Sequence, residues 1–155
     1  MTKQTSPVPA GYHTLTPYLA VRGGAAAIDF YRQAFGAEVV HRMDGPDGLL
    51  LHAELRIGDS MLQVSEEFPS IGLCAPEGDC RANALTLYTA DVDAVFARAV
   101  ELGATVLSPV ADEFSGDRMG RVLCPFGHRW VLATRVEDVA PEEVERRARE
   151  AMASS

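Results

Sequence analysis

The sequence contains two related halves, and this repeat restricts the fold more than any other feature. The segment GAEVV at 36–40 resembles GATVL at 103–107, an offset of 67 residues. A second pair, GDSMLQVS at 58–65 and GHRWVLAT at 127–134, is offset by 69 residues. In each half, the first block follows a helix-like stretch that itself follows a strand-like stretch. Because the repeat is much longer than a solenoid unit, it predicts a duplicated half-domain.

Hydrophobic periodicity predicts the same order of elements, β-α-β-β-β, in both halves. The first half is expected to have strands at 14–21, 38–44, 49–57 and 60–65, with a helix from 25 that Gly36 ends. The second half is expected to have strands at 83–90, 105–112, 119–125 and 128–134, with a helix at 91–103 that Asp91 caps. Pro141 and the acidic-then-basic order of charges after it predict a third helix, which ends at about Met152.

These elements divide the chain into five segments. We expect a flexible N-terminal arm at 1–13, a first module at 14–65, an inter-module loop at 66–80, a second module at 81–136, and a C-terminal helix with its tail at 137–155. A loop as long as 66–80 is typical of lids, linkers or disordered segments.

Composition excludes several classes of function. The chain has 155 residues and a formal net charge of −8, so it repels phosphate backbones and anionic lipid surfaces. No apolar run is long enough to span a bilayer. The N-terminal residues lack the apolar segment of a secretory signal, and the three cysteines form no C-x-x-C pair, which favours a reduced, cytoplasmic protein. We therefore expect no nucleic-acid or membrane partner.

Six motifs in order resemble one family. These are TPYLAV, AIDFYRQAFGAE, HAELRIGDS, DVDAVFARAVELGA, GDRMGRVLCPFGHRW and VEDVAPEE, which together span roughly residues 12–145. They are similar to the glyoxalase/bleomycin-resistance (vicinal oxygen chelate) superfamily and, within it, to the PhnB-like subgroup. The superfamily includes metal-dependent isomerases, glutathione transferases and dioxygenases, and also metal-free proteins that sequester antibiotics. The resemblance therefore implies a fold and not one activity.

The resemblance implies an α+β fold in which the two modules form curved mixed sheets around a cup-shaped cleft, with a homodimer as the usual assembly. Helices cover one face of each sheet, and the other face lines the cup. Alternation along 49–57 places the odd-numbered residues, which are apolar, beneath the helix. The side chains predicted to face the cup are Thr16, Tyr18, His52, Glu54, Arg56, Thr86 and Tyr88, together with Arg121, which the repeat aligns with His52.

Metal-dependent members of the family carry ligands on the first and fourth strands of each module. The strand and hairpin anchors place these positions at Thr16, Leu62, Ala84 and Val131, and none of them has an imidazole or a carboxylate. A register shift of one residue would offer Gln63 and Asn83, which are also poor ligands. The resemblance and these residues together predict that the protein binds no metal and no other cofactor.

A displaced metal site remains an alternative. His52 and Glu54 lie two apart on one strand, and His41 would join them if the neighbouring strand, which we pair at about Leu51, were shifted by one residue. The same side chains could instead form a hydrogen-bonded cluster with Arg56 and Arg121, and we favour this interpretation.

Glu54 is the strongest candidate for a functional residue. A carboxylate in a partly apolar cup either forms an ion pair, here with Arg121, Arg56 or His52, or acts on a bound molecule as a contact or a base. The loop DEFSGDRMG offers Phe114 and Arg118 as specificity residues, although for Arg118 we favour local pairing with Asp117, Asp112 or Glu113. Trp130 is expected in the core.

Two functions follow as hypotheses. The first is a metal-free protein that binds a hydrophobic or aromatic molecule, an antibiotic being one candidate. Its predicted ligand-binding residues are Thr16, Tyr18, His52, Glu54, Arg56, Leu62, Thr86, Tyr88, Phe114, Arg118 and Arg121. The alternative is a lyase or isomerase in which Glu54, with His52, abstracts a proton while Arg121 or Arg56 holds an oxyanion.

Overall fold

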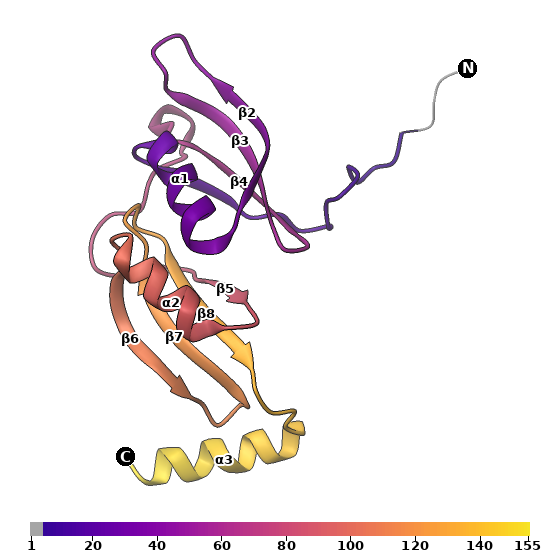
Figure 1. Cartoon of the computed structure of the whole chain (residues 1–155), viewed down its shortest axis with the longest axis vertical. Helices are drawn as coiled ribbons and strands as arrows, with labels where there is room; N and C mark the ends of the chain where they lie inside the picture. Colours follow the sequence, from indigo (N-terminus) through magenta and orange to yellow (C-terminus); the bar gives the residue numbers. More distant parts are fainter. Residues whose placement is uncertain (1–4) are drawn as a thin grey trace. The chain divides into compact units, whose positions relative to one another are not determined.

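The computed structural model describes residues 5–155 and divides into two compact units, Met1–Cys80 and Arg81–Ser155 (Figure 1). The first unit contains β1 (Tyr18–Val21), α1 (Gly24–Phe35), β2 (Glu38–Asp44), β3 (Leu50–Ile57) and β4 (Ser60–Glu66), followed by a short 3₁₀ turn (Pro69–Ile71). The second unit contains β5 (Leu85–Tyr88), α2 (Val92–Glu101), β6 (Thr105–Asp112), β7 (Asp117–Leu123), β8 (Arg129–Arg135) and α3 (Pro141–Ala153). The predicted order of elements is confirmed: the fold is α+β, with two βαβββ modules and a C-terminal helix.

Each module forms one four-stranded mixed sheet. The strand order is β1-β4-β3-β2 in the first sheet and β5-β8-β7-β6 in the second. The first and last strands of each module pair in parallel, and the remaining neighbours are antiparallel. The two halves therefore share their topology as well as their sequence pattern.

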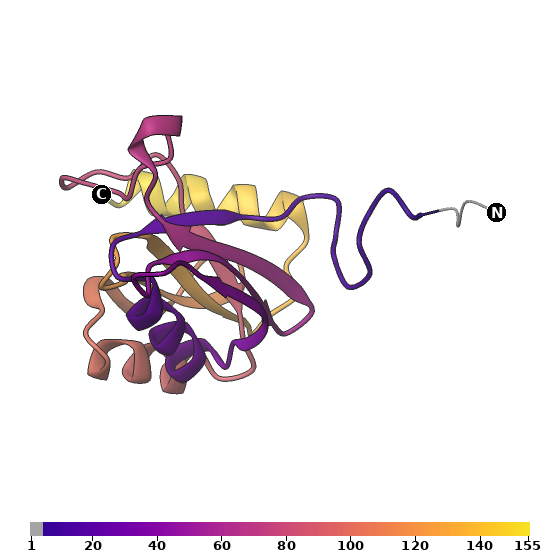
Figure 2. The same ribbon diagram turned by 90° about the horizontal axis from the view of Figure 1, so that it is seen from above.

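Helix α1 covers one face of the first sheet (Figure 2). Its inner side consists of apolar residues at helical spacing, namely Ala27, Ile28, Tyr31 and Ala34, all of which are buried. Gly36 ends the helix with a φ of 67°, a left-handed conformation that glycine adopts without strain, as predicted.

The start of α1 is fixed to β3 and β4 by two contacts. The Glu66 carboxylate accepts hydrogen bonds from the backbone N–H groups of Gly23 (3.1 Å) and Gly24 (2.5 Å). A Cβ atom at Gly24 would lie 2.5 Å from the Cβ of Leu50, so only glycine permits the helix to approach β3 this closely. The anion at the helix N-terminus also interacts favourably with the helix dipole.

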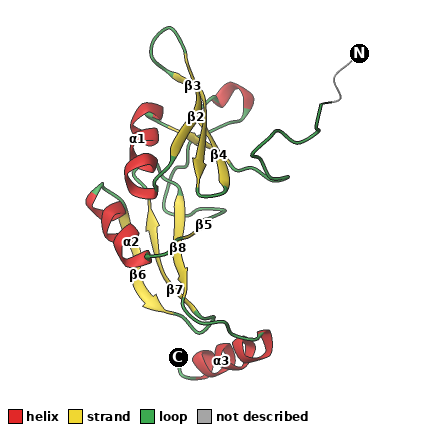
Figure 3. Cartoon of the chain, turned by 45° about the vertical axis from the view of Figure 1, so that its right-hand side comes forward, coloured by secondary structure: helices red, strands yellow, loops and turns green. Residues whose placement is uncertain are grey.

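Helix α2 covers one face of the second sheet in the same way (Figure 3). Asp91 caps it by accepting a hydrogen bond from the N–H of Ala94 at 3.1 Å, as predicted. The Thr134 hydroxyl on β8 accepts a hydrogen bond from the N–H of Val92 (2.9 Å) and donates one to the carbonyl of Thr89 (2.8 Å). Thr134 thus performs in the second module the anchoring role that Glu66 performs in the first.

The alternation predicted for 49–57 is correct from Ala53 onward and wrong before it. Ala53, Leu55 and Ile57 are buried beneath α1, but at the start of the strand Leu50 is fully buried while Leu49 is 47% exposed. The pairing between β2 and β3 is irregular here, because Met43 lies opposite His52 and Asp44 lies opposite Leu50. This leaves Leu51 as an extra residue, a β-bulge that shifts the alternation by one position.

Helix α3 begins at Pro141, as predicted, and has no buried residue. Arg147 holds it to the preceding segment through Glu137 (2.9 Å) and to its own first turn through Glu143 (2.9 Å). Gly116 supports this connection, because its carbonyl accepts hydrogen bonds from the backbone N–H groups of Val136 and Glu137. In the described part of the chain, no helix combines the length and hydrophobicity that crossing a membrane requires.

Candidate functional site

Each sheet has one face that its helix covers and one that it does not, which we call the open face. On the first open face, strand pairing aligns one residue from every strand: Tyr18 lies beside Gln63, Gln63 opposite Glu54, and Glu54 opposite His41. We call these four residues the first row. All four side chains are polar, although the opposite face of the same sheet is apolar.

His52 lies next to the first row on β3 and joins two of its members. Its Nδ1 is 3.4 Å from the Tyr18 hydroxyl, and the two rings are tilted with centroids 5.7 Å apart. Its Nε2 is 3.6 Å from a carboxylate oxygen of Glu54. The side chains of His52 and Glu54 are about three-quarters buried, with 24% and 26% of their surfaces exposed. The result is a chain of polar contacts that runs from β1 to β3.

Tyr12, in the predicted arm, contributes a sixth polar group to this site. A turn in which the N–H of Tyr12 donates to the carbonyl of Pro9, with Gly11 at a φ of 81°, directs the chain back toward the sheet. The Tyr12 hydroxyl is buried beside Glu54 and Gln63, yet it has no hydrogen bond of good geometry within residues 5–155. Burial raises the pKa of Tyr12, and the Glu54 carboxylate raises it further.

Sequence reasoning missed Tyr12, although it held a signal. The tetrapeptide Pro9-Ala10-Gly11-Tyr12 is typical of a turn with glycine at its third position. Nothing in the arm's hydrophobic pattern indicates that its tyrosine reaches the sheet. The neighbouring His13 and Thr14 are exposed.

A bulge in β2 brings His41 onto the open face. Val39 lies opposite Leu55 while His41 lies opposite Glu54, so Val40 is an additional residue in the strand. We predicted that His41 pairs at about Leu51, and the structure shows that this register is wrong. Its imidazole nevertheless shares a face with Glu54, as the alternative register required.

The prediction for Leu62 is also wrong. Leu62 lies opposite Leu55, and both are buried on the face that α1 covers, whereas the residue of β4 on the open face is Gln63. The error arose from aligning the two hairpins at their glycines. In the first hairpin, Ile57 pairs with Ser60 around a turn of two residues. In the second, the backbone N–H of Cys124 donates to the carbonyl of His128 around a turn of three residues, so the second hairpin is one residue longer. Thr16 precedes β1 by two residues and is half-buried.

The second open face carries the corresponding row. Thr86 lies beside Val131, Val131 opposite Arg121, and Arg121 opposite Ser108. We call these residues the second row. They follow the first row at offsets of 67 or 68 residues, so Arg121 corresponds to Glu54 and not to His52 as predicted. The Arg121 guanidinium contacts Glu113 (3.3 Å), Ser108 (3.2 Å) and the sulfur of Met119 (3.3 Å).

A second network lies beside this row. The Tyr88 hydroxyl donates a hydrogen bond to Asp117 at 3.0 Å, and Arg135 forms an ion pair with the same carboxylate at 2.6 Å. Asp117 is buried, with only 6% of its side chain exposed. Tyr88 therefore faces the open side, as predicted, with its hydroxyl already engaged.

The two residues predicted from the loop before β7, Phe114 and Arg118, do not belong to the second row. Arg118 lies on β7 and forms ion pairs with Asp93 of α2 (2.8 Å) and with Asp112 (3.1 Å), so local pairing with Asp112 is correct as predicted. These contacts raise the pKa of Arg118 and lower that of Asp93. Phe114 lies in the loop after β6 and is 43% exposed. Trp130 is buried opposite Val122 on the helix side, as predicted.

The guanidiniums expected near Glu54 are engaged with other carboxylates. Arg56 forms an ion pair with Glu38 across β2 and β3 at 2.8 Å, and Arg121 with Glu113. Of the two partners predicted for Glu54 from its own unit, His52 is found and Arg56 is not.

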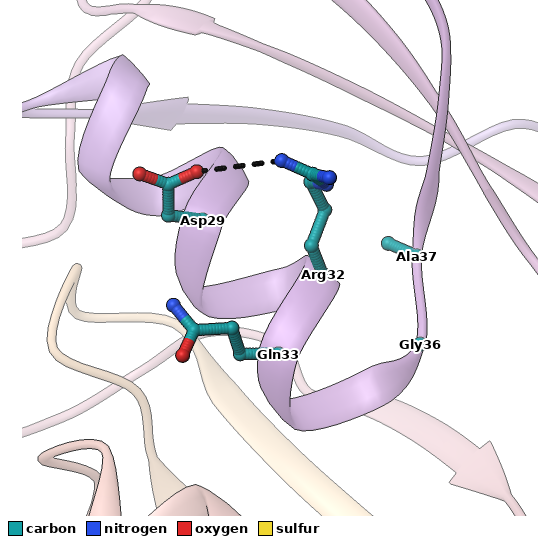
Figure 4. A pocket seen from close by; sticks show the side chains of 5 residues that line it. All are labelled: Asp29, Arg32, Gln33, Gly36 and Ala37. Carbon is teal, nitrogen blue, oxygen red and sulfur yellow. Dashed lines mark ion pairs between the residues drawn. The ribbon is translucent and has the colours of Figure 1, made fainter.

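A pocket of about 470 Å³ lies on the outer side of α1, away from these residues (Figure 4). It is lined by Asp29, Arg32, Gln33, Gly36 and Ala37. Asp29 and Arg32 form an ion pair of 3.8 Å across it. None of the predicted site residues lines this pocket.

Comparison with known families identifies the fold. The family model described as the Glyoxalase/Bleomycin resistance protein/Dioxygenase superfamily matches residues 12–132. The chain belongs to this superfamily. The superfamily resemblance predicted from the motifs is therefore confirmed.

Individual proteins are also similar to this chain in sequence or in fold. The uncharacterized protein Rv0887c of Mycobacterium tuberculosis is 39% identical over 135 residues, which cover 84% of this chain and 79% of that protein. The crystal structure of the Arabidopsis thaliana protein At5g48480 is 27% identical, covers 79% of this chain and 98% of that one, and has a TM-score of 0.63. The PhnB protein from Bacillus cereus shares the fold at 18% identity, with a TM-score of 0.64 over 79% of this chain and 99% of its own.

The corrected register allows a test of the metal site that metal-dependent members of the superfamily imply. The open-face residues on the first and fourth strands are Tyr18 and Gln63 in the first row, and Thr86 and Val131 in the second. None supplies an imidazole or carboxylate, so these positions do not fit a divalent transition metal. Within residues 5–155, no three His, Cys, Asp or Glu side chains converge in an arrangement that could hold a metal ion.

Proposed function

We propose that this protein binds small hydrophobic or aromatic molecules on the open faces of its sheets and does so without a metal. The observation that carries this proposal is the first row with its neighbours. Tyr12, Tyr18, His52, Glu54 and Gln63 gather polar groups and aromatic rings on one open face, and within residues 5–155 no set of metal ligands accompanies them.

The mixture of side chains suits such a ligand. Sites for small molecules combine apolar and aromatic surface, which supplies affinity, with a few polar groups, which set orientation. The ring of Tyr18 is 41% exposed, and Met43, opposite His52, is 48% exposed. Glu54 and Gln63 are half-buried beside them and offer the polar contacts. An antibiotic is one candidate within this class of ligand.

The second open face contributes less in this proposal. Thr86 and the ring of Tyr88 are exposed there and offer a surface for stacking. Arg121 and the Tyr88 hydroxyl are already engaged within the module. We therefore propose that polar recognition takes place on the first open face.

A thermal-shift screen of neutral aromatic and hydrophobic compounds tests this function. We expect hits to raise the Tm of the full-length protein and to lose most of this effect in Tyr18→Ala. The matched control is Leu15→Ala, because Leu15 lies just before the sheet and is 87% exposed. The proposal is wrong if no compound raises the Tm, or if the hits bind Tyr18→Ala and the wild type equally.

The contact chain Tyr18–His52–Glu54 favours one alternative, a lyase or isomerase with Glu54 as the general base. The contacts of 3.4 and 3.6 Å would let His52 orient the Glu54 carboxylate and accept the proton that it abstracts, while the Tyr18 hydroxyl holds the imidazole in place. The proposed oxyanion residues Arg56 and Arg121 are engaged with Glu38 and Glu113, which lessens support for this reaction. For a compound that is turned over, Glu54→Gln should abolish turnover and leave affinity unchanged if Glu54 is a base. Loss of affinity alone indicates binding.

We also propose that the chain is a homodimer of the PhnB-like subgroup that acts in the cytoplasm. Support for the subgroup comes from the six ordered motifs and from the fold shared with the Bacillus cereus PhnB protein. Sedimentation equilibrium at micromolar concentration tests the assembly, since a dimer has twice the 16.7 kDa mass of the chain.

A further inference from the structure

The Glu54 carboxylate is about three-quarters buried, and within the described part of its own unit, residues 5–80, the basic side chains beside it are histidines, His52 and the cross-strand neighbour His41. Its one ion-pair contact in the described part of the chain is His52, at 3.6 Å, and imidazole is charged only when it is protonated. No arginine of its own unit, within residues 5–80, forms an ion pair with it. A carboxylate that is largely removed from water is costly unless a cation or several hydrogen-bond donors compensate it.

The neighbouring carboxylates differ in this respect. Glu38, on the same open face, pairs with Arg56 at 2.8 Å. On the second sheet, Arg135 pairs with Asp117 at 2.6 Å and Arg121 with Glu113 at 3.3 Å. Each of these three acids therefore has an arginine partner, whereas Glu54 has none within the described part of its own unit.

The groups around Glu54 are those that recognise an ammonium group. The faces of tyrosine rings attract cations, and Tyr18 presents its exposed ring one strand away from Gln63. The Tyr12 hydroxyl, buried beside Glu54 without a hydrogen bond of good geometry, has an oxygen that can accept one. An N–H donor placed between them would satisfy both oxygens.

From this arrangement, and resting on the proposed binding function, we propose that the first open face selects organic cations: molecules with an aromatic or apolar body that carry a positive charge and an amine N–H donor. The amine donates to Glu54 and to the Tyr12 oxygen, and the aromatic body lies against Tyr18 and Met43. Carboxylate-bearing ligands are rejected because they would face Glu54 in a chain whose net charge is −8.

Three acridines of nearly equal shape test this selectivity by calorimetry at physiological salt, which screens non-specific attraction. They are 9-aminoacridine, a cation at neutral pH, acridine, which is neutral there, and acridine-9-carboxylate. We expect 9-aminoacridine to bind at least about tenfold more tightly than acridine, as a charge-assisted hydrogen bond would provide. The carboxylate should bind most weakly.

Glu54→Gln is the decisive variant because it keeps the shape of the side chain and removes its charge. We expect it to weaken 9-aminoacridine at least about tenfold and to leave acridine nearly unchanged. Glu38→Gln is the matched control: it makes the same change of charge on the same open face, at a side chain that is 68% exposed and paired with Arg56. It should alter binding of either compound by less than about twofold.

Tyr18→Leu provides a second test that leaves all charges in place. Loss of the ring should weaken 9-aminoacridine several-fold more than acridine if cation–π attraction contributes. Equal binding of the cation and the neutral compound, or equal effects of Glu54→Gln and Glu38→Gln, would overturn the cation proposal. So would a failure of all three acridines to bind. The screen of neutral compounds decides separately whether the face binds small molecules at all.

Discussion

The two modules share a topology but use their open faces differently. In the first row Glu54 occupies the position that Arg121 occupies in the second, and Gln63 corresponds to Val131. The second module balances Arg121 with Glu113, and Asp117 with Arg135 and Tyr88. The first module places a tyrosine, a glutamine and two histidines beside Glu54, namely Tyr12, Gln63, His41 and His52.

This comparison distinguishes features that both modules need for their fold from features that differ between the modules. Both modules retain a polar group on the last strand that anchors the helix N-terminus, Glu66 in one and Thr134 in the other. Both also place glycine where helix and sheet meet: Gly24, the first residue of α1, lies against Leu50 of β3, and Gly120 of β7 lies against Phe96 of α2. The open faces are not constrained by this packing. On the second open face, the charged groups pair with one another. On the first, Glu54 has no arginine partner from its own unit and the Tyr12 hydroxyl has no hydrogen bond of good geometry within residues 5–155, and we propose that a ligand binds there.

The largest predicted effect comes from disrupting the satisfied face. Asp117→Ala removes a carboxylate that is 94% buried and leaves Tyr88 and Arg135 without their partner. We expect the free energy of unfolding to fall by about 2–3 kcal/mol, the loss typical of a buried hydrogen bond to a charged group. Chemical denaturation monitored by the fluorescence of Trp130 measures it.

Glu54→Gln is the matched change on the first open face. Because Glu54 has no strong ion pair to lose, its removal should change the free energy of unfolding by less than about 0.5 kcal/mol. If both variants lost the same stability, the distinction between a structural face and a ligand-binding face would be wrong.

Removing either helix anchor, Glu66 or Thr134, should lower the free energy of unfolding by less than Asp117→Ala does, and by similar amounts in the two modules. Glu66→Ala leaves the N–H groups of Gly23 and Gly24 without an acceptor, and Thr134→Val does the same to Val92. Each change should cost about 1 kcal/mol, as loss of a helix cap does. Hydrogen exchange should become faster for the amides of α1 in Glu66→Ala and for the amides of α2 in Thr134→Val, because each variant weakens the start of one helix. Equal loss of protection in both helices would contradict it.

The pKa of the Tyr12 hydroxyl provides a test at a single side chain. Burial and the Glu54 carboxylate hold its pKa above the usual 10.0, so the folded state favours the neutral phenol. The resulting stabilisation is complete below pH 10 and is lost as the pH rises through the folded-state pKa. Carbon-13 NMR of the tyrosine rings measures the titration, and Glu54→Gln should lower this pKa.

Tyr12→Phe is the control, since it removes the titrating group and keeps the ring. Its stability should show less loss above pH 10 than that of the wild type. A Tyr12 signal that titrates at its usual pKa in the wild-type protein would contradict burial of the hydroxyl beside Glu54.

Periodicity and the repeat were sufficient to predict the eight strands, the three helices and the caps at Gly36 and Asp91, because these depend on local patterns. Alternation also predicted that Tyr18, His52 and Glu54 lie on one face, and the contacts of His52 with Tyr18 and Glu54 confirm this. Wherever a strand stays regular, one correct register orients every side chain along it.

The errors occur where one residue is inserted. A bulge at Val40 moved His41, a bulge at Leu51 moved Leu50, and a longer hairpin turn exchanged Leu62 for Gln63. Each insertion shifts the following side chains to the other face, and hydrophobic patterns alone do not locate it. Contacts between distant segments, such as Tyr12 beside Glu54, leave still less trace in the sequence.

The smallest predicted effect concerns α3, which has no counterpart in the first module. Arg146 and Arg147 lower the pKa of Glu143 from 4.5 to about 2. Because the folded-state pKa is depressed, this carboxylate stabilises α3 above pH 4.5, and its contribution is lost as the pH falls toward 2. NMR of the α3 amides should show local fraying in this interval before the sheets unfold. In Glu143→Gln the helix should already be partly frayed at neutral pH and change less on acidification. If the α3 signals of the wild type persisted until global unfolding, packing and not these exposed ion pairs would hold the helix in place.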